Sequence, residues 1–286
     1  MEKLHFTKMQ GCANDYIYLD CIKNPFPEDI EKLAVEMSRR HFSVGSDGII
    51  CVCKPDCHEN DAKMRIFNAD GSEGKMCGNG IRCVAKFLYD NGYITCDSTK
   101  IESLSGVKPI RLIIENGICT GAVVGMGRAE MECDKIPVIY AEKCMINRPI
   151  DVCGKEYNVT SVSMGNPHAV VFLPYSPREF ELEKIGPSFE NHKIFPEKVN
   201  TEFVHVESRN ILEMRVWERG SGETYACGTG ACASAIAAVV NGLADANVPI
   251  KVKLIGGELE ITVTDELDVT MAGPAETVYE GEYFLR

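Results

Sequence analysis

Two cysteines stand in matching glycine-rich loops in the two halves of this 286-residue chain. Residues 68–92 read NADGSEGKMCGNGIRCVAKFLYDNG, and residues 218–242 read ERGSGETYACGTGACASAIAAVVNG. Aligned at a constant offset, the segments share Glu73/Glu223, Cys77/Cys227, Gly78/Gly228, Gly80/Gly230, Ala85/Ala235, Asn91/Asn241 and Gly92/Gly242. Each loop precedes an apolar run of helical length that ends at Asn-Gly. We interpret the pair as a duplicated fold that brings two thiols to one site.

The residue types in these loops suit proton transfer at a carbon next to a carboxylate. A cysteine placed just before a helix has its thiolate favoured by the helix dipole and by free backbone N–H groups. The same N–H groups bind a carboxylate, and glycines let the backbone approach it closely. Two such loops facing each other fit an amino-acid racemase that works without a cofactor. One thiolate would remove the α-proton, and the opposing thiol would protonate the other face.

The elements that must position these loops are predicted from periodicity and turn residues. Helices are expected after Pro27, with Ile30, Leu33, Ala34 and Met37 on one face, and around 178–185. The run from Gly230 to Val240 is apolar all round, which predicts a helix buried on every side. Strands are expected at 5–20 (two strands around a turn), 48–53, 63–67, 110–115, 118–126, 158–164, 168–173, 202–207, 211–217, 250–255, 258–264, 267–271 and 276–284.

These elements predict an α/β (α+β) fold of two pseudo-symmetric domains, each a curved mixed β-sheet wrapped around a central helix. The chain turns polar with little periodicity around 128–136, so the boundary is placed there. We expect a first domain of 1–130 that carries the Cys77 loop, with strand 275–286 as a candidate addition. The second domain, 131–274, carries the Cys227 loop.

Composition excludes several classes of function. A net charge of −12, with no dense Lys/Arg run, disfavours a nucleic-acid surface. No apolar run approaches the roughly 20 residues that span a bilayer, and the amino terminus lacks the apolar stretch of a signal peptide. We therefore expect a cytoplasmic protein without a membrane partner, whose 14 cysteines are mostly reduced.

Five segments resemble the signature segments of the diaminopimelate epimerase family, in the family's order and along essentially the whole chain. They are FTKMQGCANDYIYLD, FNADGSEGKMCGNGIR, SMGNPHAVVF, FPEKVNTEFV and WERGSGETYACGTGACASA. The resemblance implies an isomerase that converts LL-diaminopimelate to the meso form for lysine and peptidoglycan synthesis, without pyridoxal phosphate or metal. It also implies two domains with the site between them, and a homodimer.

The resemblance also implies roles for individual residues. Cys77 and Cys227 would be the acid–base pair, assisted by hydrogen bonds from His168 and Glu218. The substrate's far amino and carboxylate groups would be held by Asn14, Asn68, Asn166, Asn200, Glu218 and Arg219. The carboxylate at the reacting centre would be bound by loop groups of Gly78, Asn79, Gly228 and Thr229. Gly48 stands where many members carry a glutamine that helps to line the site.

Three alternatives remain open from the residues. A racemase of another amino acid, such as histidine, could use the same two-cysteine chemistry on the same fold. Gly228-Thr229-Gly230-x-x-Ala233 formally matches a dinucleotide-binding pattern, although no acid follows a strand at the required distance. Residues 51–60, CVCKPDCHEN, could ligate zinc, although paired CxxC motifs are missing. We also expect that oxidation could join Cys77 and Cys227 in a disulfide if their sulfurs lie close together.

Overall fold

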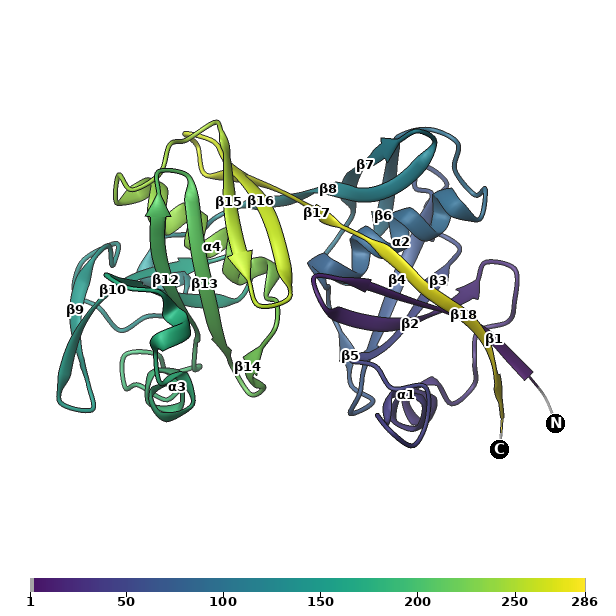
Figure 1. Cartoon of the computed structure of the whole chain (residues 1–286), viewed down its shortest axis with the longest axis horizontal. Helices are drawn as coiled ribbons and strands as arrows, with labels where there is room; N and C mark the ends of the chain where they lie inside the picture. The colour runs from purple at the N-terminus through teal and green to yellow at the C-terminus, as the bar shows by residue number, and fades with distance from the viewer. Residues whose placement is uncertain (1–2, 286) are drawn as a thin grey trace. The chain divides into compact units, whose positions relative to one another are not determined.

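The computed structural model describes residues 3–285 and divides the chain into two compact units. The first unit contains Met1–Gly125 together with Ala272–Arg286, and the second contains Met126–Met271. The division at 125/126 falls inside a strand. Figure 1 shows the elements of each unit and the course of the chain through them.

The first unit follows the order β-β-α-β-β-β-α-β-β-β and recruits a strand from the end of the chain. Its elements are β1 (Lys3–Gly11), β2 (Asn14–Cys21), α1 (Ile30–Ser38), β3 (Gly48–Cys53), β4 (Ala62–Asn68), β5 (Glu73–Gly74), α2 (Gly78–Asp90), β6 (Ser98–Glu102), β7 (Lys108–Glu115), β8 (Ile118–Arg128) and β18 (Glu276–Phe284). The sheet is mixed, because β2–β3 and β4–β6 are parallel pairs while β1–β2, β3–β4 and β6–β7 are antiparallel. Strand β18 pairs antiparallel with β1.

The second unit repeats that order element by element. It consists of β10 (Lys155–Ser163), β11 (Pro167–Leu173), α3 (Leu182–Glu190), β12 (Asn200–Ser208), β13 (Ile211–Glu218), β14 (Gly222–Thr224), α4 (Gly228–Val240), β15 (Pro249–Leu254), β16 (Gly257–Val263) and β17 (Asp268–Pro274). The pairing repeats as well: β11–β12 and β13–β15 are parallel, and β10–β11 and β12–β13 are antiparallel. Strand β9 (Arg148–Val152) lies against β10 as β18 lies against β1. The expected α+β class with two equivalent units is confirmed.

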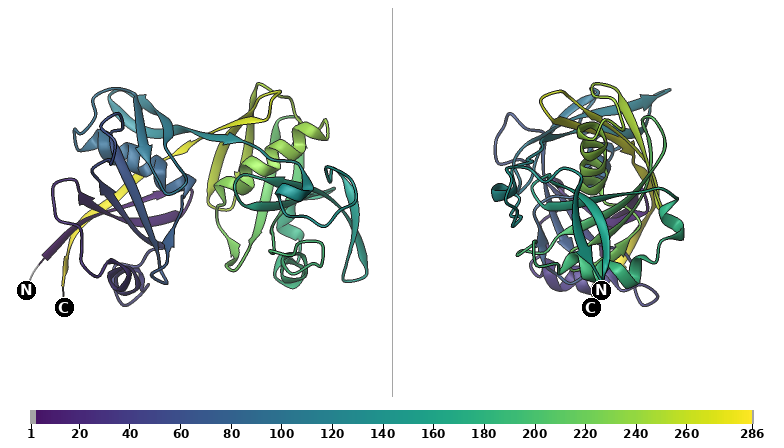
Figure 2. Two further views of the ribbon diagram at one scale, coloured as in Figure 1. Left: turned by 180° about the vertical axis from the view of Figure 1, so that it is seen from behind. Right: turned by 90° about the vertical axis from the view of Figure 1, so that its left-hand side faces the viewer.

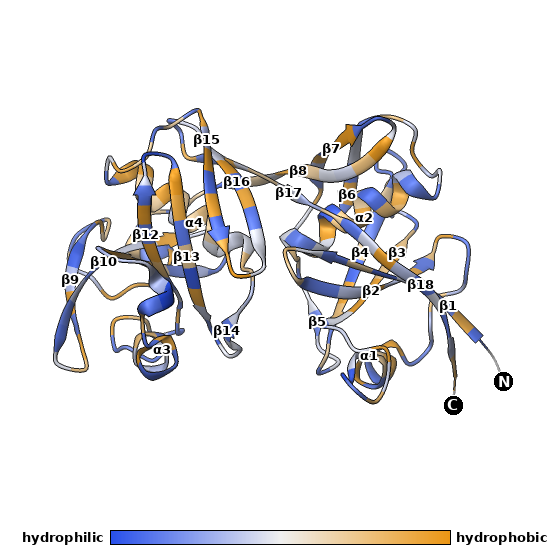
Figure 3. Ribbon diagram, in the orientation of Figure 1, coloured by the Kyte–Doolittle hydropathy of each residue, from blue (hydrophilic) through white to orange (hydrophobic). Residues whose placement is uncertain are grey.

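Each unit is built around one buried helix (Figures 1 and 2). Helix α4 contacts strands β10–β13, β15 and β16, and helix α2 contacts β1, β2, β6, β7 and β18. Five alanines and one isoleucine are among the 13 residues of α4, and residues 230–238 are buried, as its apolar sequence predicts. Alternating apolar and polar residues along β13 and β15, visible in Figure 3, place one face of each strand against the core.

Paired arginine–glutamate bridges repeat in the two units and brace the hairpins that lead into the cysteine loops. Arg65 Nε lies 2.7 Å from Glu73 Oε1, and Arg215 Nε lies 2.7 Å from Glu223 Oε1. In both pairs a second guanidinium N–H bonds the other carboxylate oxygen, at 3.0 and 2.8 Å. The shared glutamates of the two sequence segments therefore have one common structural role.

The helix expected at 178–185 is wrong in both its start and its end. A 3₁₀ turn, η2 (Pro177–Glu179), is followed by an extended residue, Phe180, and α3 begins only at Leu182. Phe180 turns into the core, where its ring lies 4.3 Å from that of Phe203. The helix then continues through Pro187 to Glu190, and Phe189 near its end is fully buried. Short strands β5, β6, β9 and β14 and the 3₁₀ turn η1 (Cys133–Lys135) were not expected from the sequence.

Neither a membrane-spanning helix nor a cluster of metal ligands is found in the described part of the chain. None of the helices within residues 3–285 combines the length and apolar content needed to cross a bilayer. In the same part of the chain, no group of three or more His, Cys, Asp or Glu side chains is arranged to hold a metal ion.

Candidate active site

Cys77 is the N-cap of α2 in the first unit. Its backbone is extended (φ −135°, ψ 117°), and its sulfur accepts a hydrogen bond from the N–H of Gly80 at 3.3 Å. The cap satisfies one of the N–H groups that a helix leaves unpaired at its start. The remaining N–H groups of the first turn, on Gly78 and Asn79, lie beside the sulfur and suit an anion.

Asn14, the first residue of β2, contacts the Cys77 sulfur. The thiol donates to Asn14 Oδ1 at 3.2 Å, and Asn14 Nδ2 donates to Asp47 Oδ2 at 2.8 Å. Asp47 also accepts from the backbone N–H of Asp15 at 3.1 Å and from Arg40 Nη2 at 3.0 Å. The carboxylate therefore fixes the Asn14 amide with its oxygen facing the thiol. Sequence reasoning missed Asp47 and Arg40.

Asn68 and Asn79, the other asparagines predicted for the first unit, differ in which of their polar groups a ligand could reach. Asn68, at the end of β4, donates from Nδ2 to Ser72 Oγ at 3.1 Å. The side chain of Asn79 is buried and accepts from Arg82 Nη2 at 3.0 Å, so only the Asn79 backbone is available to a carboxylate. Arg82 also donates to the carbonyl oxygen of Gly78 at 3.1 Å.

Gly48 opens β3 in a conformation that requires glycine. Its φ is +155°, and a Cβ there would lie 2.1 Å from the carbonyl oxygen of Phe67. A glutamine would not fit at this position unless the β3–β4 backbone moved.

Cys227 occupies the corresponding position at the start of α4. Its backbone is again extended (φ −117°, ψ 109°), and its sulfur accepts from the N–H of Gly230 at 3.3 Å. Thr229 Oγ1 lies 3.5 Å from the sulfur. Both helices run for 13 residues and end at an asparagine C-cap, Asn91 or Asn241.

A hydrogen-bonded chain approaches Cys227 from β11 and β12. His168 Nδ1 lies 2.7 Å from Glu202 Oε1, and His168 Nε2 lies 3.1 Å from Asn166 Oδ1. Asn166 Nδ2 in turn donates to Thr229 Oγ1 at 3.3 Å. The structure thus connects the predicted residues Asn166, His168 and Thr229 to the Cys227 sulfur. Glu202 was missed, although a glutamate within the apolar strand sequence TEFV was a usable signal.

Two acidic side chains lie close to Cys227. Burial raises the pKa of the Cys227 thiol well above its usual value, and the carboxylates of Glu218 and Glu202 raise it further. Burial also raises the pKa of Glu218, whose carboxylate accepts a hydrogen bond from Thr224 Oγ1. In this conformation Cys227 therefore holds its proton as a thiol.

Asn200 and Arg219 form a second group in the second unit. Asn200 Nδ2 donates to the carbonyl oxygen of Pro167 at 3.0 Å, and its Oδ1 accepts from the backbone N–H of Arg219 at 2.9 Å. The Arg219 guanidinium donates from Nη1 to the Glu197 carbonyl oxygen at 3.0 Å. Asn200 thus connects the strand that carries His168 with the residue that follows Glu218.

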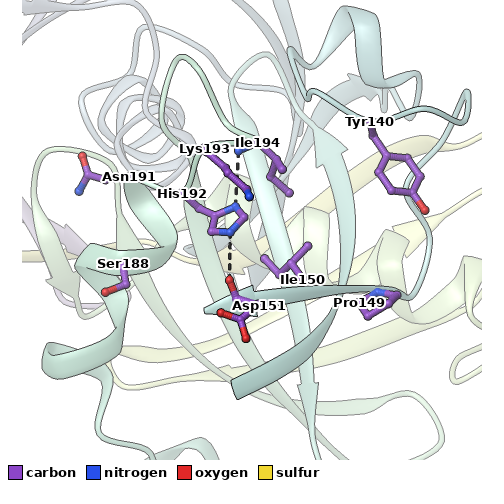
Figure 4. A pocket seen from close by; sticks show the side chains of 9 residues that line it. All are labelled: Tyr140, Pro149, Ile150, Asp151, Ser188, Asn191, His192, Lys193 and Ile194. Atoms are coloured by element: carbon purple, nitrogen blue, oxygen red, sulfur yellow. Dashed lines mark hydrogen bonds between the residues drawn. The ribbon is translucent and has the colours of Figure 1, made fainter. Parts of the chain in front are cut away.

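A pocket on the second unit lies apart from these residues. It has a volume of about 520 Å³ and is lined by Tyr140, Pro149, Ile150, Asp151, Ser188, Asn191, His192, Lys193 and Ile194 (Figure 4). His192 Nε2 donates to the Asp151 carbonyl oxygen at 3.1 Å, and His192 Nδ1 accepts from the Ile194 N–H at 3.5 Å. None of the predicted site residues lines this pocket, so it is not the candidate active site.

Comparisons with known proteins identify the family. The family model for diaminopimelate epimerase matches residues 6–132 and 160–278. Similar relatives include the diaminopimelate epimerases of Desulfovibrio desulfuricans (47% identical, covering 99% of each chain) and Acetivibrio thermocellus (45%, 99% of each). That of Methanococcus maripaludis is 46% identical over 98% of this chain and 99% of the relative.

Solved structures share the fold at low identity. A phenazine biosynthesis protein of the PhzF family from Bacillus anthracis matches with a TM-score of 0.69 at 17% identity, covering 100% of both chains. A probable proline racemase from Agrobacterium radiobacter matches with a TM-score of 0.72 at 13% identity, covering 99% of this chain and 93% of that one. With a family model over most of its length and relatives above 40% identity, this chain belongs to the diaminopimelate epimerase family.

Proposed function

We propose that this chain is an isomerase that interconverts LL- and meso-2,6-diaminopimelate by proton exchange at the α-carbon. The single observation that carries the proposal is the full-length similarity, at 45–47% identity, to relatives named diaminopimelate epimerase. The two cysteine-capped helices supply the reactive groups that such a reaction needs. In the cell the product would serve the synthesis of lysine and of peptidoglycan precursors in the cytoplasm.

In the proposed reaction Cys77 and Cys227 act as base and acid. The thiolate of one takes the α-proton, and the electron pair left on the carbon is delocalised into the substrate carboxylate. The thiol of the other then donates its proton to the opposite face, so the two cysteines exchange protonation states in each turnover. No pyridoxal phosphate is needed, because the N–H groups at the starts of α2 and α4 stabilise the charge on the carboxylate.

The remaining residues would bind the substrate and hold the sulfurs in position. Glu218 and His168 would make hydrogen bonds near Cys227. These bonds would change when the sulfur passes between its thiol and thiolate forms. Arg219 offers a planar fork suited to the substrate's distal carboxylate. Asparagines 14, 68, 166 and 200 would orient the distal polar groups without adding charge, which favours a substrate with a second amino-acid head.

Solvent-deuterium exchange tests the function directly. The purified protein, without added pyridoxal phosphate, would be incubated in ²H₂O with LL-diaminopimelate, meso-diaminopimelate, histidine and proline in turn. Loss of the α-proton signal and appearance of the other diaminopimelate isomer are expected. Faster exchange with histidine or proline would instead assign the chain to the alternative, a racemase of another amino acid on the same fold.

We also propose that the chain forms a homodimer through β18. Three large apolar side chains on this strand are exposed, Val278 at 55%, Tyr279 at 44% and Phe284 at 51%. Light scattering after size exclusion should give twice the chain mass of 31.6 kDa for the wild type and the single-chain mass for Val278→Glu. A Val278→Glu variant that remains dimeric would place the interface elsewhere.

A further inference from the structure

Glu202 is an acidic side chain in the dry interior of the second unit, where it bonds to His168. The side chains of Glu202 and His168 are both 0% exposed, and Oε1 lies 2.7 Å from His168 Nδ1. The other oxygen, Oε2, is buried without a hydrogen-bond partner among residues 3–285. A carboxylate held this way costs folding free energy, and an apolar side chain of similar size is commonly no less stable.

The first unit shows that the fold does not require a charge at this position. In the parallel pair β2–β3, Ile17 pairs with Ile49, which sets Tyr16 opposite Gly48. In the equivalent pair β11–β12, His168 pairs with Asn200, so Glu202 corresponds to Ile50. A Cβ on Gly80 would lie 2.6 Å from Ile50 Cδ1, and a Cβ on Gly230 would lie 2.7 Å from Glu202 Oε1. The same space beneath the cysteine-capped turn holds isoleucine in one unit and glutamate in the other.

Glu202 controls the orientation of a histidine that is linked to Cys227. With Nδ1 bonded to the carboxylate, the imidazole turns Nε2 toward Asn166 Oδ1, an atom that can only accept, so Nε2 carries a hydrogen. Asn166 then has its amide nitrogen free to donate to Thr229 Oγ1. The Thr229 hydroxyl, 3.5 Å from the Cys227 sulfur, can donate to a thiolate or accept from a thiol.

We propose that Glu202 is a positioning residue for the Cys227 half of the site, which it serves by fixing His168 and, through Asn166 and Thr229, the hydrogen bond to the sulfur. This inference rests on the proposed function of Cys227. These hydrogen bonds lead from Glu202 to the sulfur that exchanges a proton. Losing them should therefore slow proton transfer more than it weakens substrate binding. The burial of a costly carboxylate is then explained by the reaction and not by packing.

Two substitutions at position 202, with a control in the first unit, test the inference. Glu202→Gln keeps the shape, and Glu202→Ile installs the residue that the first unit uses. Glu202→Gln should fold with a Tm close to that of the wild type, and Glu202→Ile should fold with a lower Tm, because it leaves His168 Nδ1 buried without its partner. In both variants kcat should fall about tenfold or more while KM changes less than about threefold. The control Ile50→Val removes one methyl group at the equivalent position and should leave kcat nearly unchanged. A Glu202→Ile variant with wild-type kcat would overturn the inference.

A spectroscopic measurement separates this inference from the proposed function. In the wild type the hydrogen bond between His168 Nδ1 and Glu202 should give a downfield, slowly exchanging proton resonance, assigned by its loss in His168→Gln. The resonance should disappear in Glu202→Ile, and its persistence there would show that Glu202 does not hold the ring. If the wild type shows this resonance but epimerises no amino acid, the proposed function is wrong. The conclusion that Glu202 holds the His168 ring would still stand.

Discussion

Cys77 and Cys227 hold the same position in two copies of one structural unit, yet their surroundings differ. Each caps a 13-residue helix and accepts the N–H of the third helical residue at 3.3 Å. Cys77 donates to a neutral amide, Asn14, whereas Cys227 lies close to two acidic side chains, the half-buried Glu218 and the fully buried Glu202. The duplicated backbone therefore presents two thiols that are alike in geometry and unlike in electrostatics.

Alanine at the two equivalent glycines should have unequal effects. In Gly230→Ala the new Cβ would meet Glu202 Oε1 at 2.7 Å and the Cys227 sulfur at 3.2 Å. In Gly80→Ala it would meet the mobile end of Ile50 at 2.6 Å and the Cys77 sulfur at 3.6 Å. We expect Gly230→Ala to lose about 1–3 kcal/mol of stability and at least about tenfold in kcat/KM. Gly80→Ala should lose less of both, because Ile50 can change rotamer. Equal losses in thermal unfolding and kinetics would contradict this account.

Glu218→Gln should stabilise the protein at neutral pH while reducing its activity. Burial raises the pKa of Glu218, so the folded state favours the protonated carboxyl. The protonated carboxyl contributes its full share to folding stability below the pKa of the unfolded state. That contribution is lost as pH rises through the pKa of the folded state. A glutamine cannot ionise, so the variant should gain on the order of 1 kcal/mol, about 2–4 °C in Tm, at about pH 8.

The gain from Glu218→Gln should vanish near about pH 4, where the wild-type carboxyl is protonated in both states. The matched control is Glu223→Gln, which weakens the bridge to Arg215 and should lower Tm at neutral pH. Thermal unfolding across this pH range checks both variants. A Glu218→Gln variant less stable than wild type at about pH 8 would show that the ionised carboxylate is well solvated or well paired.

Asp47→Ala should impair the Cys77 half of the site without touching a cysteine. The substitution removes the acceptor of Asn14 Nδ2 and the partner of Arg40, so the Asn14 amide is no longer fixed against the thiol. We expect a loss of about tenfold in kcat/KM and about 1–3 kcal/mol in stability. Asp56→Ala is the control, because Asp56 is an exposed carboxylate that bridges Lys63 in the same unit. Steady-state kinetics that leave the two variants indistinguishable would exclude the role of Asp47.

Local patterns predicted much of the fold correctly. The face of α1 formed by Ile30, Leu33, Ala34 and Met37 is buried, as its spacing indicates. The Asn116-Gly117 turn between β7 and β8 has positive φ at both residues, 53° and 78°, as the dipeptide predicts. The α3 boundaries failed because tertiary packing of Phe180 and Phe189 outweighed the local helix signals.

The residues that support the cysteines were harder to predict than the cysteines themselves. Cys77 and Cys227 are marked by a repeated local sequence, whereas Asp47 and Glu202 act through partners on other strands. Asp47 contacts Asn14, 33 residues away, and Glu202 contacts His168, 34 residues away. Only the parallel pairing of β2 with β3, and of β11 with β12, brings these side chains together.

The central claim is that Cys77 and Cys227 are the two proton-transfer residues of one epimerase, and α-proton exchange in ²H₂O with single variants tests it most directly. Cys77→Ala and Cys227→Ala should each reduce conversion of LL- to meso-diaminopimelate to near background. Serine variants, which keep an oxygen at the helix cap, should keep the fold and control for stability. If either alanine variant retains more than about a tenth of the wild-type rate, a barrier change below about 1.4 kcal/mol, the two-cysteine mechanism is wrong.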